Sequence, residues 1–557
     1  MYQQVYDPVS NSLGASSIFA ALPLITLFVL LGGMKMKAQW AGLISLAVAL
    51  IVAIAVYSMP VGQAFDSAAE GAAFGLFPIM WIVVNAVWIY TMTVKTGDFA
   101  VLRRSFASIS SDQRIQAVII AFSFGALLEA LAGFGTPVAI TSVMLIALGF
   151  KPIKAASVAL VANTAPVAFG AIAIPIVTLA QVTGLDKQDL GSMVGRQTPF
   201  VALIVPFILV FIVDGLRGIR QTWPVVLVGA FVFALFQFLT SNYVSVELTD
   251  IAASLMSVFS MVLFLQIWQP SEPLEGEASA GGARPAIAGA STDNPAVERE
   301  VGGQRGGGDN FAAVLRAYAP YLIIIAVFAI AQLGPVKDFL ANRTEMFQWP
   351  GLHITNGKGK DLMSLAYKFD WAAAAGSLLL VCGVITALVL RIKPRIALEA
   401  YRETLAQLKW AILTVAAVLA LAYVMNQSGQ TTTIGMWAAG AGSAFAFLSP
   451  LIGWLGTAIT GSDTSSNSLF GVLQVTAAKD AGLNPILLAA GNSSGGVLGK
   501  MISPQNLAIG AAAVGMAGEE GELFRKVLKW SLIMVAIMAV LVLLQSKSVL
   551  DWMVVKP

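Results

Sequence analysis

Long apolar stretches alternate with short polar connections along almost the whole chain. Up to residue 268 the apolar stretches cover about 16–33, 40–58, 72–93, 115–133, 138–150, 154–181, 197–213, 222–240 and 251–268. They resume near 317–334, 370–390, 410–426, 433–460, 466–478, 484–511 and 528–546. A membrane-spanning helix needs about 20 mostly apolar residues, and several of these stretches are too short or too rich in glycine to cross alone. The pattern therefore predicts an all-α integral membrane protein with about 12 transmembrane helices plus helical hairpins.

Two polar segments interrupt this pattern. Residues 269–310 contain charged residues, Gly, Pro and Ala without aliphatic periodicity. They bury too little apolar surface to fold, so we expect a disordered cytoplasmic linker. Residues 335–369 form a second polar insertion, which we expect outside the membrane. The chain accordingly divides into a first half at 1–240, a connecting region at 241–316 that contains the linker, and a second half at 317–557.

The two halves share landmarks at a nearly constant separation. At 329 residues the matched pairs are Asn163 with Asn492, Gly170 with Gly499, and Pro175 with Pro504. At 328 residues they are Gly133 with Gly461 and Thr136 with Thr464. Repeats with interrupted helices at matching positions are typical of secondary transporters. We therefore expect two structural repeats, each with a hairpin and a broken helix.

The positions of Lys and Arg predict the orientation of the spans. Residues 1–34, 59–71 and 241–250 contain no basic residue. Basic residues occur in the connections at 35–37, 95–114, 151–154, 214–221 and 391–409. Because cytoplasmic loops are enriched in Lys and Arg, we expect a bacterial cytoplasmic (inner) membrane protein with its N-terminus outside. Stretch 16–33 then runs inward and 317–334 outward, so the two repeats have inverted topology. No basic residue precedes the first apolar stretch, so no secretory signal is expected.

Composition excludes several classes of protein. Hydrophobic residues make up 57% of the 557 residues and charged residues only 11%, against roughly 25% charged in soluble domains. A net charge of +3 is too small to indicate a nucleic-acid partner, and the partners expected are a small solute and membrane lipid. The chain has a single cysteine, Cys382, and a single histidine, His353. Thiolate metal clusters, bis-histidine haem and a histidine proton relay are thereby excluded, so we expect no metal, no cofactor and no enzymatic activity.

The interrupted segments supply the candidate substrate site. Gly-Phe-Gly-Thr-Pro at 133–137 and Gly-Ser-Asp-Thr-Ser-Ser-Asn at 461–467 break helices. Non-helical backbone at membrane depth is tolerated where it is buried or lines a cavity, and free helix N-termini favour an anion. The candidate substrate-binding residues are Thr136, Asn163, Thr164, Ser462, Thr464, Ser465, Asn467, Asn492, Ser493 and Lys500. Neutral hydrogen-bonding groups around one cation suit a small hydroxylated carboxylate.

Three charged residues lie within these apolar segments: Glu129, Asp463 and Lys500. Charge at membrane depth is costly and usually functional. We expect Lys500 to pair with a substrate carboxylate or with Asp463. Glu129 or Asp463 is the expected carrier of a coupled proton, since neither hairpin contains a histidine.

Structural interpretations remain open for each of these residues. Small and hydroxylated residues also let membrane helices pack closely. Glu129 would be solvated if it lay near a membrane face, Lys500 would be structural if it only paired with Asp463, and Asn163 and Asn492 would serve as helix caps.

Four long motifs resemble the bacterial lactate permease family, which includes glycolate permeases. They are LLEALAGFGTPVAI (127–140), VANTAPVAFGAIAIPI (161–176), GWLGTAITGSDTSSN (453–467) and GGVLGKMISPQNLAI (495–509). The resemblance covers nearly the whole chain and is weakest at 271–310 and 335–366. It implies proton-coupled uptake of L-lactate, and often of D-lactate and glycolate, across the inner membrane. It also places family motif residues at the hairpin and broken-helix positions named above, with Gly133, Pro137 and Ser503 in addition.

Two functions of different kinds remain in competition. The first is a monocarboxylate:proton symporter that works by alternating access. The second is an uncoupled channel or uniporter for small anions, which would not need Glu129 or Asp463 to titrate. A membrane-bound dehydrogenase would need a cofactor site, and the sequence contains no nucleotide fingerprint, haem ligand pair or metal cluster.

Overall fold

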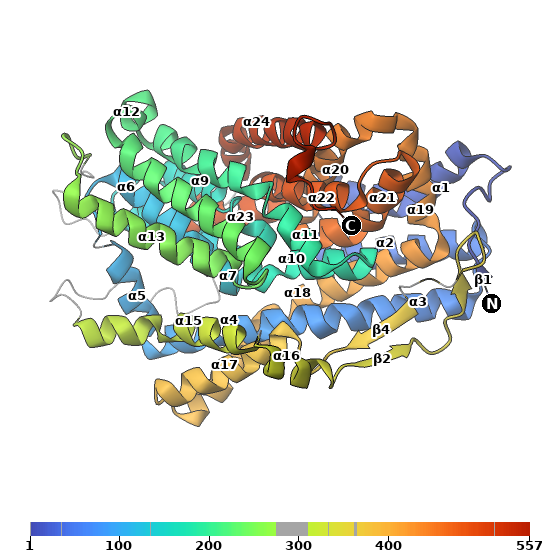
Figure 1. Ribbon diagram of the computed structural model, residues 1–557, viewed down its shortest axis with the longest axis horizontal. Helices are drawn as coiled ribbons and strands as arrows, with labels where there is room; N and C mark the ends of the chain where they lie inside the picture. Colours follow the sequence, from blue (N-terminus) through green and yellow to red (C-terminus); the bar gives the residue numbers. More distant parts are fainter. Residues whose placement is uncertain are drawn as a thin grey trace.

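The computed structural model describes residues 2–556 except 35, 108, 134, 275–309, 332, 361, 363–364 and 517–518. Helices account for nearly all regular structure in the described part, as the all-α class requires (Figure 1). The predicted disordered linker falls mostly at 275–309, outside the described residues.

Thirteen labelled α-helices precede the linker among the described residues. They are α1 Leu13–Phe28, α2 Ala38–Ala55, α3 Val61–Phe74, α4 Trp81–Thr96, α5 Asp98–Ala107, α6 Gln113–Gln116, α7 Gly125–Ala132, α8 Thr136–Ala147, α9 Pro152–Ala162, α10 Gly170–Thr183, α11 Lys187–Val194, α12 Thr198–Tyr243 and α13 Thr249–Ile267. Wider π-helical turns at Gly75–Met80 and Ala117–Phe124 join α3 to α4 and α6 to α7.

The second half begins after the linker. Its helices are α15 Phe311–Ala331, α16 Gly334–Ala341, α17 Ala375–Val389, α18 Pro394–Ser428, α19 Gln430–Ala438, α20 Phe445–Thr460, α21 Asp463–Asp480, α22 Pro485–Gly499, α23 Pro504–Ala513 and α24 Glu520–Gln545. Four short strands complete the described elements: β1 Tyr2–Gln3, β2 Glu345–Gln348, β3 Ile354–Thr355 and β4 Ala366–Phe369.

Ten described helical segments are long and apolar enough to cross a membrane, or eleven if the bent pair α9–α10 counts as one span. The sequence predicted about 12. One candidate, Lys187–Tyr243, has 57 residues, which is far more than one crossing needs. It is broken at Asp214 and Gly215, where the backbone leaves helical geometry. Helix α17 has 15 residues, which is fewer than the roughly 20 that a full crossing needs. The difference from 12 therefore lies in how broken and short helices are counted.

The helices form two groups that lie side by side. Helix α18 packs against α2, α3 and α4, while α17 packs against α4 and α15. In the other group α12 packs against α13, α20 against α22 and α24, and α8 against α9 and α23. Figure 1 shows α4, α15 and α17 along its lower side and α12, α13, α20 and α24 along its upper side. Helices α10 and α21 touch each other, and both contact the first group through α4 and α18.

At one end of the molecule the N-terminal strand meets the 335–369 insertion. Strand β1 pairs in parallel with β3, and β2 pairs with β4 in an antiparallel ladder. The Tyr2 hydroxyl donates to the carbonyls of Tyr57 and Ser428. The insertion, which the sequence predicted only as polar, is thus folded onto the N-terminus in its described part. The N-terminus and the insertion therefore lie on the same side of the helices. The charge pattern predicted that these two segments share a side.

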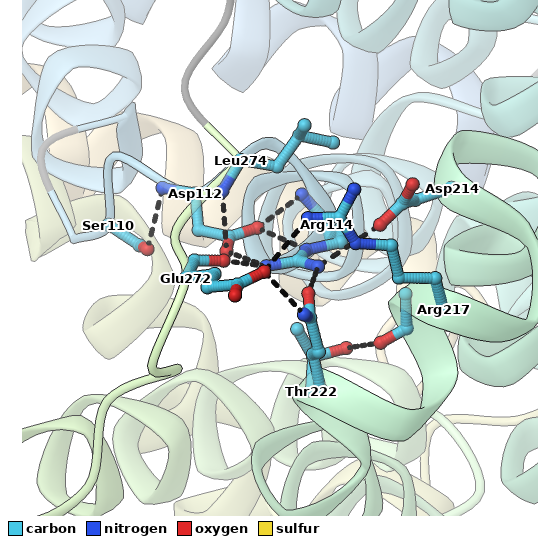
Figure 2. Close-up of polar contacts among 10 residues, drawn as sticks. Ser110, Asp112, Arg114, Asp214, Arg217, Thr222, Glu272 and Leu274 are labelled. Carbon is cyan, nitrogen blue, oxygen red and sulfur yellow. Dashed lines mark hydrogen bonds and ion pairs between the residues drawn. The ribbon is translucent and has the colours of Figure 1, made fainter.

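At the other end a buried arginine joins three segments that the charge pattern also placed together. The Arg114 guanidinium forms ion pairs with Asp112 (2.7 Å) and Asp214 (3.1 Å) and donates to Gln221 and to the Glu272 carbonyl. Figure 2 shows these side chains converging, with the Leu274 amide on the Asp112 carboxylate. The sequence analysis used Arg114 only as one of the basic residues of the connection at 95–114. The structure adds that Arg114 is 1% exposed and ion-paired.

Candidate functional site

Two hairpins and two broken helices build the candidate site. Helix α7 ends at Ala132 and α8 begins at Thr136, and α20 and α21 turn at 461–462. Gly135 and Gly461 have φ of +88° and +78°, a left-handed conformation that residues with a Cβ adopt at a cost. Helix α9 ends at Ala162, and the start of α10 is irregular, because Ala171, Ile172 and Ala173 within it have left-handed backbone. The chain leaves α-helical geometry a second time at Lys500–Ile502, between α22 and α23.

A buried ion pair connects the two halves of the chain. Lys500 Nζ lies 2.7 Å from Glu129 Oε1, although the residues are 371 positions apart. Asn163 Nδ2 donates to the other carboxylate oxygen of Glu129 at 2.9 Å. Glu129 is 3% exposed and Lys500 is 5% exposed, so the alternative of a solvated Glu129 at a membrane face is wrong. An ion pair removed from water is retained only when hydrogen bonds satisfy its remaining groups, as Asn163 does here.

Lys500 does not pair with Asp463, the protein partner that the sequence suggested. The sequence offered a substrate carboxylate or Asp463, whereas the structure pairs Lys500 with Glu129. Lys500 begins the turn between α22 and α23, and its carbonyl accepts from the Ser503 hydroxyl at 2.9 Å. Ser503 also caps α23, because its side chain accepts from the Asn506 amide. The cation is therefore fixed at a helix break and not on a flexible loop.

The second carboxylate, Asp463, begins α21 at the other hairpin tip. Ser462 caps this helix by accepting from the Ser465 amide at 3.3 Å. Asp463 Oδ2 accepts from the Ser493 hydroxyl at 2.6 Å and from Asn467 Nδ2 at 3.3 Å. Thr457 donates to Oδ1 at 3.4 Å. Hydroxyl and amide donors, not a salt bridge, hold this carboxylate.

The two asparagines at matching positions of the broken helices make different contacts, and neither side chain caps a helix. Asn163 ends α9, but its amide donates to Glu129. Asn492 lies within α22, donates to Asn467 Oδ1 at 2.9 Å and accepts from Gln474 at 3.0 Å. Asn467 in turn donates to the Pro175 carbonyl at 3.1 Å. The second hairpin is thereby tied to both broken helices.

Glycines make room for the two carboxylates. A Cβ on Gly170 would lie 2.8 Å from Glu129 Oε1, and one on Gly496 would lie 2.0 Å from Asp463 Oδ1. Such contacts are too short, so even alanine would displace the acid. These glycines, like Gly133 beside Glu129, allow close approach to a polar group.

The remaining predicted residues lie at the first broken helix and at the two hairpin tips. Thr164 is buried, and its hydroxyl bonds back to the Val161 carbonyl at 2.7 Å. Thr136 is half-buried at the start of α8. Thr464 and Ser465 are 9% and 7% exposed on the first turn of α21. Among the described residues, the side-chain hydroxyls of Thr136, Thr464 and Ser465 form no hydrogen bond, although the Thr464 carbonyl accepts from Ser468. These three hydroxyls are the ones left for a solute.

Sequence analysis missed several neutral residues that extend the site. Gln197 accepts from Ser494 at 2.7 Å and donates to Gln545 at 3.0 Å. Gln237 donates to the Ala165 carbonyl at 3.2 Å. All three glutamines are fully buried. In the sequence, the feature that could have identified these residues is a glutamine inside an apolar stretch. Among the described residues no group of three or more His, Cys, Asp or Glu side chains could hold a metal ion.

Comparison with known proteins agrees with the motifs. The family model described as L-lactate permease matches residues 16–549. The glycolate permease GlcA of Escherichia coli is 43% identical, with 98% of each chain covered. The L-lactate permease of Escherichia coli is 42% identical over the full length of both chains. That of Bacillus subtilis is 41% identical and covers 99% of this chain and 100% of its own.

The chain belongs to the L-lactate permease family. The resemblance drawn from the four motifs is confirmed. As a permease family member with ten or more apolar helices, the chain is a multi-pass membrane protein and a transporter, not an enzyme.

Two solved transporter structures also resemble this permease. The YdaH transporter of Alcanivorax borkumensis aligns with a TM-score of 0.43 and 13% identity over 86% of both chains. The MtrF protein of Neisseria gonorrhoeae aligns with a TM-score of 0.44 and 14% identity, covering 86% of this chain and 83% of its own.

Proposed function

We propose that this permease is a symporter that takes up L-lactate together with a proton across the bacterial cytoplasmic membrane, with D-lactate and glycolate as further substrates. Relatives named lactate and glycolate permeases support the substrate class. The observation that carries the coupling is the buried ion pair between Glu129 and Lys500, which joins the first hairpin to the second broken helix.

Charge balance gives the coupling its physical basis. Without substrate, the Glu129 carboxylate neutralises the Lys500 ammonium. A lactate carboxylate that binds Lys500 takes the place of Glu129 and leaves that acid buried without its counter-ion. An uncompensated charge at membrane depth is costly, so Glu129 takes up a proton. Both the empty and the loaded site are then neutral and can change their exposure from one side to the other.

The substrate hydroxyl and its orientation are assigned to the neutral groups. Thr136 begins α8, and Thr464 and Ser465 lie on the first turn of α21, so all three are at the two hairpin tips. We assign contacts with lactate to them, together with Asn163, Thr164, Ser462, Asn467, Asn492 and Ser493. Asp463 is the second candidate proton carrier, because it is a buried acid held only by neutral donors.

The proposed orientation places the N-terminus outside. The pairing of β1 with β3 supports a common side for the N-terminus and the insertion. The Arg114 cluster supports a common side for the connections at 112–114, 214–221 and 272–274. The excess of Lys and Arg assigns that second side to the cytoplasm. We also retain the inverted repeat as a proposal.

An uncoupled channel or uniporter is the alternative. Labelled L-lactate uptake into proteoliposomes with and without an imposed pH gradient separates the two. The symporter predicts accumulation driven by an acidic outside and alkalinisation of the external medium when lactate is added. Uptake that ignores the gradient would refute the symporter and favour the alternative.

Substrate range is tested by competition. Unlabelled D-lactate, glycolate, pyruvate and acetate are each added to labelled L-lactate. If the hydroxyls at the hairpin tips recognise the 2-hydroxy group, D-lactate and glycolate compete more strongly than acetate. Equal competition by acetate would remove that role.

A further inference from the structure

Asp250 is a buried acid that neither half of the candidate site contains. It lies in the first turn of α13 and is 1% exposed. Its Oδ1 atom accepts from Gln237 Nε2 at 3.4 Å, and its Oδ2 atom has no hydrogen-bond partner among the described residues. Within that part of the chain it also forms no ion pair. The residue before the helix, Leu248, provides no side-chain cap, and no amide of α13 donates to Asp250. A capping role therefore does not explain this acid.

One polar side chain, Gln237, joins Asp250 to the turn next to Asn163, the residue that donates to Glu129. The Gln237 amide group donates to Asp250 and to the Ala165 carbonyl at 3.2 Å, while its oxygen accepts from Thr198 at 3.2 Å. Ala165 belongs to the turn that follows Asn163, the residue that donates to Glu129. Helix α13 also packs directly on α7, which bears Glu129.

On its other side Asp250 lies next to the connection at 244–248. There Glu247 and Lys187 form an ion pair. The Lys187 side chain is 42% exposed, so the pair reaches the surface. In the proposed orientation this surface faces outside. Burial would raise the pKa of Glu247, but the charge and hydrogen bond of Lys187, with the Ser245 hydroxyl, leave it below its ordinary value. Glu247 is thus a fixed anion at neutral pH and not a carrier, which leaves Asp250 as the titratable group between surface and site.

We propose that Asp250 is a second proton-binding group, which takes a proton from the external side and passes it to Glu129. The proposal rests on the symport function above and names its external proton route. In the transfer the O–H bond on Asp250 breaks and one forms on the Glu129 carboxylate, which lactate has separated from Lys500. Asp250 is left ionised and regains a proton from external water. The groups facing it are Glu129 from α7, Gln237 from α12, and the Glu247–Lys187 pair.

The test compares net uptake with exchange. Net uptake requires the proton to be delivered and released in each cycle, whereas exchange of labelled for unlabelled lactate only requires the loaded permease to change its exposure. The full-length protein is studied in right-side-out membrane vesicles. Net uptake of labelled L-lactate is followed over a range of external pH, and exchange is measured at equal pH on both sides.

Asp250→Asn keeps the shape and the bond from Gln237 but cannot carry a proton. We expect net uptake to fall roughly 100-fold, the low end of what a positioned proton carrier contributes. We expect net uptake in this variant to lose its dependence on external pH, while exchange stays near the wild-type rate. Asp250→Glu restores a carrier and should restore both rate and pH profile. The matched control is Glu70→Gln, which removes a buried acid that is bonded to Gln427 on α18 and should leave the profile unchanged.

Three results would overturn the relay. One is wild-type net uptake and pH profile in Asp250→Asn. Another is an equal loss of exchange and net uptake that Asp250→Glu does not repair, which means a structural role. If Asp250→Asn does not reach the membrane, Gln237→Leu replaces it, and an unchanged ratio of net uptake to exchange counts against the relay. If the wild-type vesicles themselves show no uptake driven by pH, the symport function fails instead.

Discussion

At the scale of residues, the site depends on how one ammonium is shared. Lys500 holds Glu129 at 2.7 Å, and no second cation contacts Glu129 among the described residues. In the proposed mechanism, a lactate carboxylate therefore competes with Glu129 for the same ammonium. This competition links substrate binding to protonation without any conformational signal.

Removing the cation should weaken substrate binding. In Lys500→Ala we expect the binding free energy of lactate to drop by about 2 kcal/mol or more, as when one partner of a buried charge pair is truncated. Binding to the purified protein is measured by calorimetry. Lys479→Ala, which removes an exposed lysine at the end of α21, is the control and should bind normally. Normal binding in Lys500→Ala would assign Lys500 to structure alone.

Removing the proton carrier should separate binding from accumulation. Glu129→Gln keeps an acceptor for Lys500 but takes up no proton, so lactate exchange should persist while accumulation against a gradient is lost. Asp463→Asn is made in parallel, and the same two rates are measured. The variant that keeps exchange and loses accumulation identifies the carrier. Wild-type accumulation in Glu129→Gln would show that Glu129 is not that carrier.

At the scale of elements, helix breaks and close packing position these groups. Helices α20 and α22 approach so closely that a Cβ on Gly495 would lie 2.0 Å from the Pro450 carbonyl, and one on Gly453 would lie 1.9 Å from the Asn492 carbonyl. Backbone atoms cannot rotate away as side chains can. Helix α20 of the second hairpin is therefore held tightly against α22, the helix that leads into the turn at Lys500.

Filling this contact should destabilise the protein. Gly495→Ala forces α20 and α22 apart, and overpacking of this kind costs about 1–3 kcal/mol. The measurement is the midpoint of thermal unfolding in detergent. The control is Gly521→Ala in α24, where a Cβ meets nothing within 4 Å and the better helix propensity of alanine should stabilise by up to about 1 kcal/mol. Equal midpoints for the two variants would contradict the packing account.

The sequence could predict the breaks and the charges but not the pairing. Gly-Phe-Gly-Thr-Pro and the polar run at 461–467 mark helix ends locally, and Glu129 and Lys500 stand out because charge is rare in apolar stretches. Their mutual contact depends on two helices that meet only in the folded chain. Asp250 was missed for a different reason. It lies at the boundary of an apolar stretch, where an acid ordinarily faces water, and only the tertiary structure shows it buried.

At the scale of the whole molecule, ion pairs of Arg114 hold together the segments at one end. Arg114 draws together α6, the break in α12 and the segment after α13 (Figure 2). From the sequence Arg114 looked like a topology signal, because its burial depends on Asp112, two residues before it, and on Asp214, 100 residues away. The pairing of β1 with β3 fastens the opposite end.

Breaking the arginine cluster should destabilise the fold more than breaking a surface pair. Arg114→Ala leaves Asp112 buried without its cation, which costs about 3–5 kcal/mol. Arg217→Ala removes an exposed pair with Glu272, which contributes little in water. Thermal unfolding of the two variants is compared at low and high salt. A similar loss in both would show that the buried cluster has no special role.

The central claim is that lactate and a proton cross together so that the site stays neutral. The most direct test is a pH gradient and a membrane potential imposed separately on proteoliposomes that contain the purified permease. Uptake of labelled L-lactate should follow the pH gradient and remain unaffected by the potential, with external alkalinisation equal to the lactate taken up. Uptake that follows the potential, or that proceeds without alkalinisation, would contradict it.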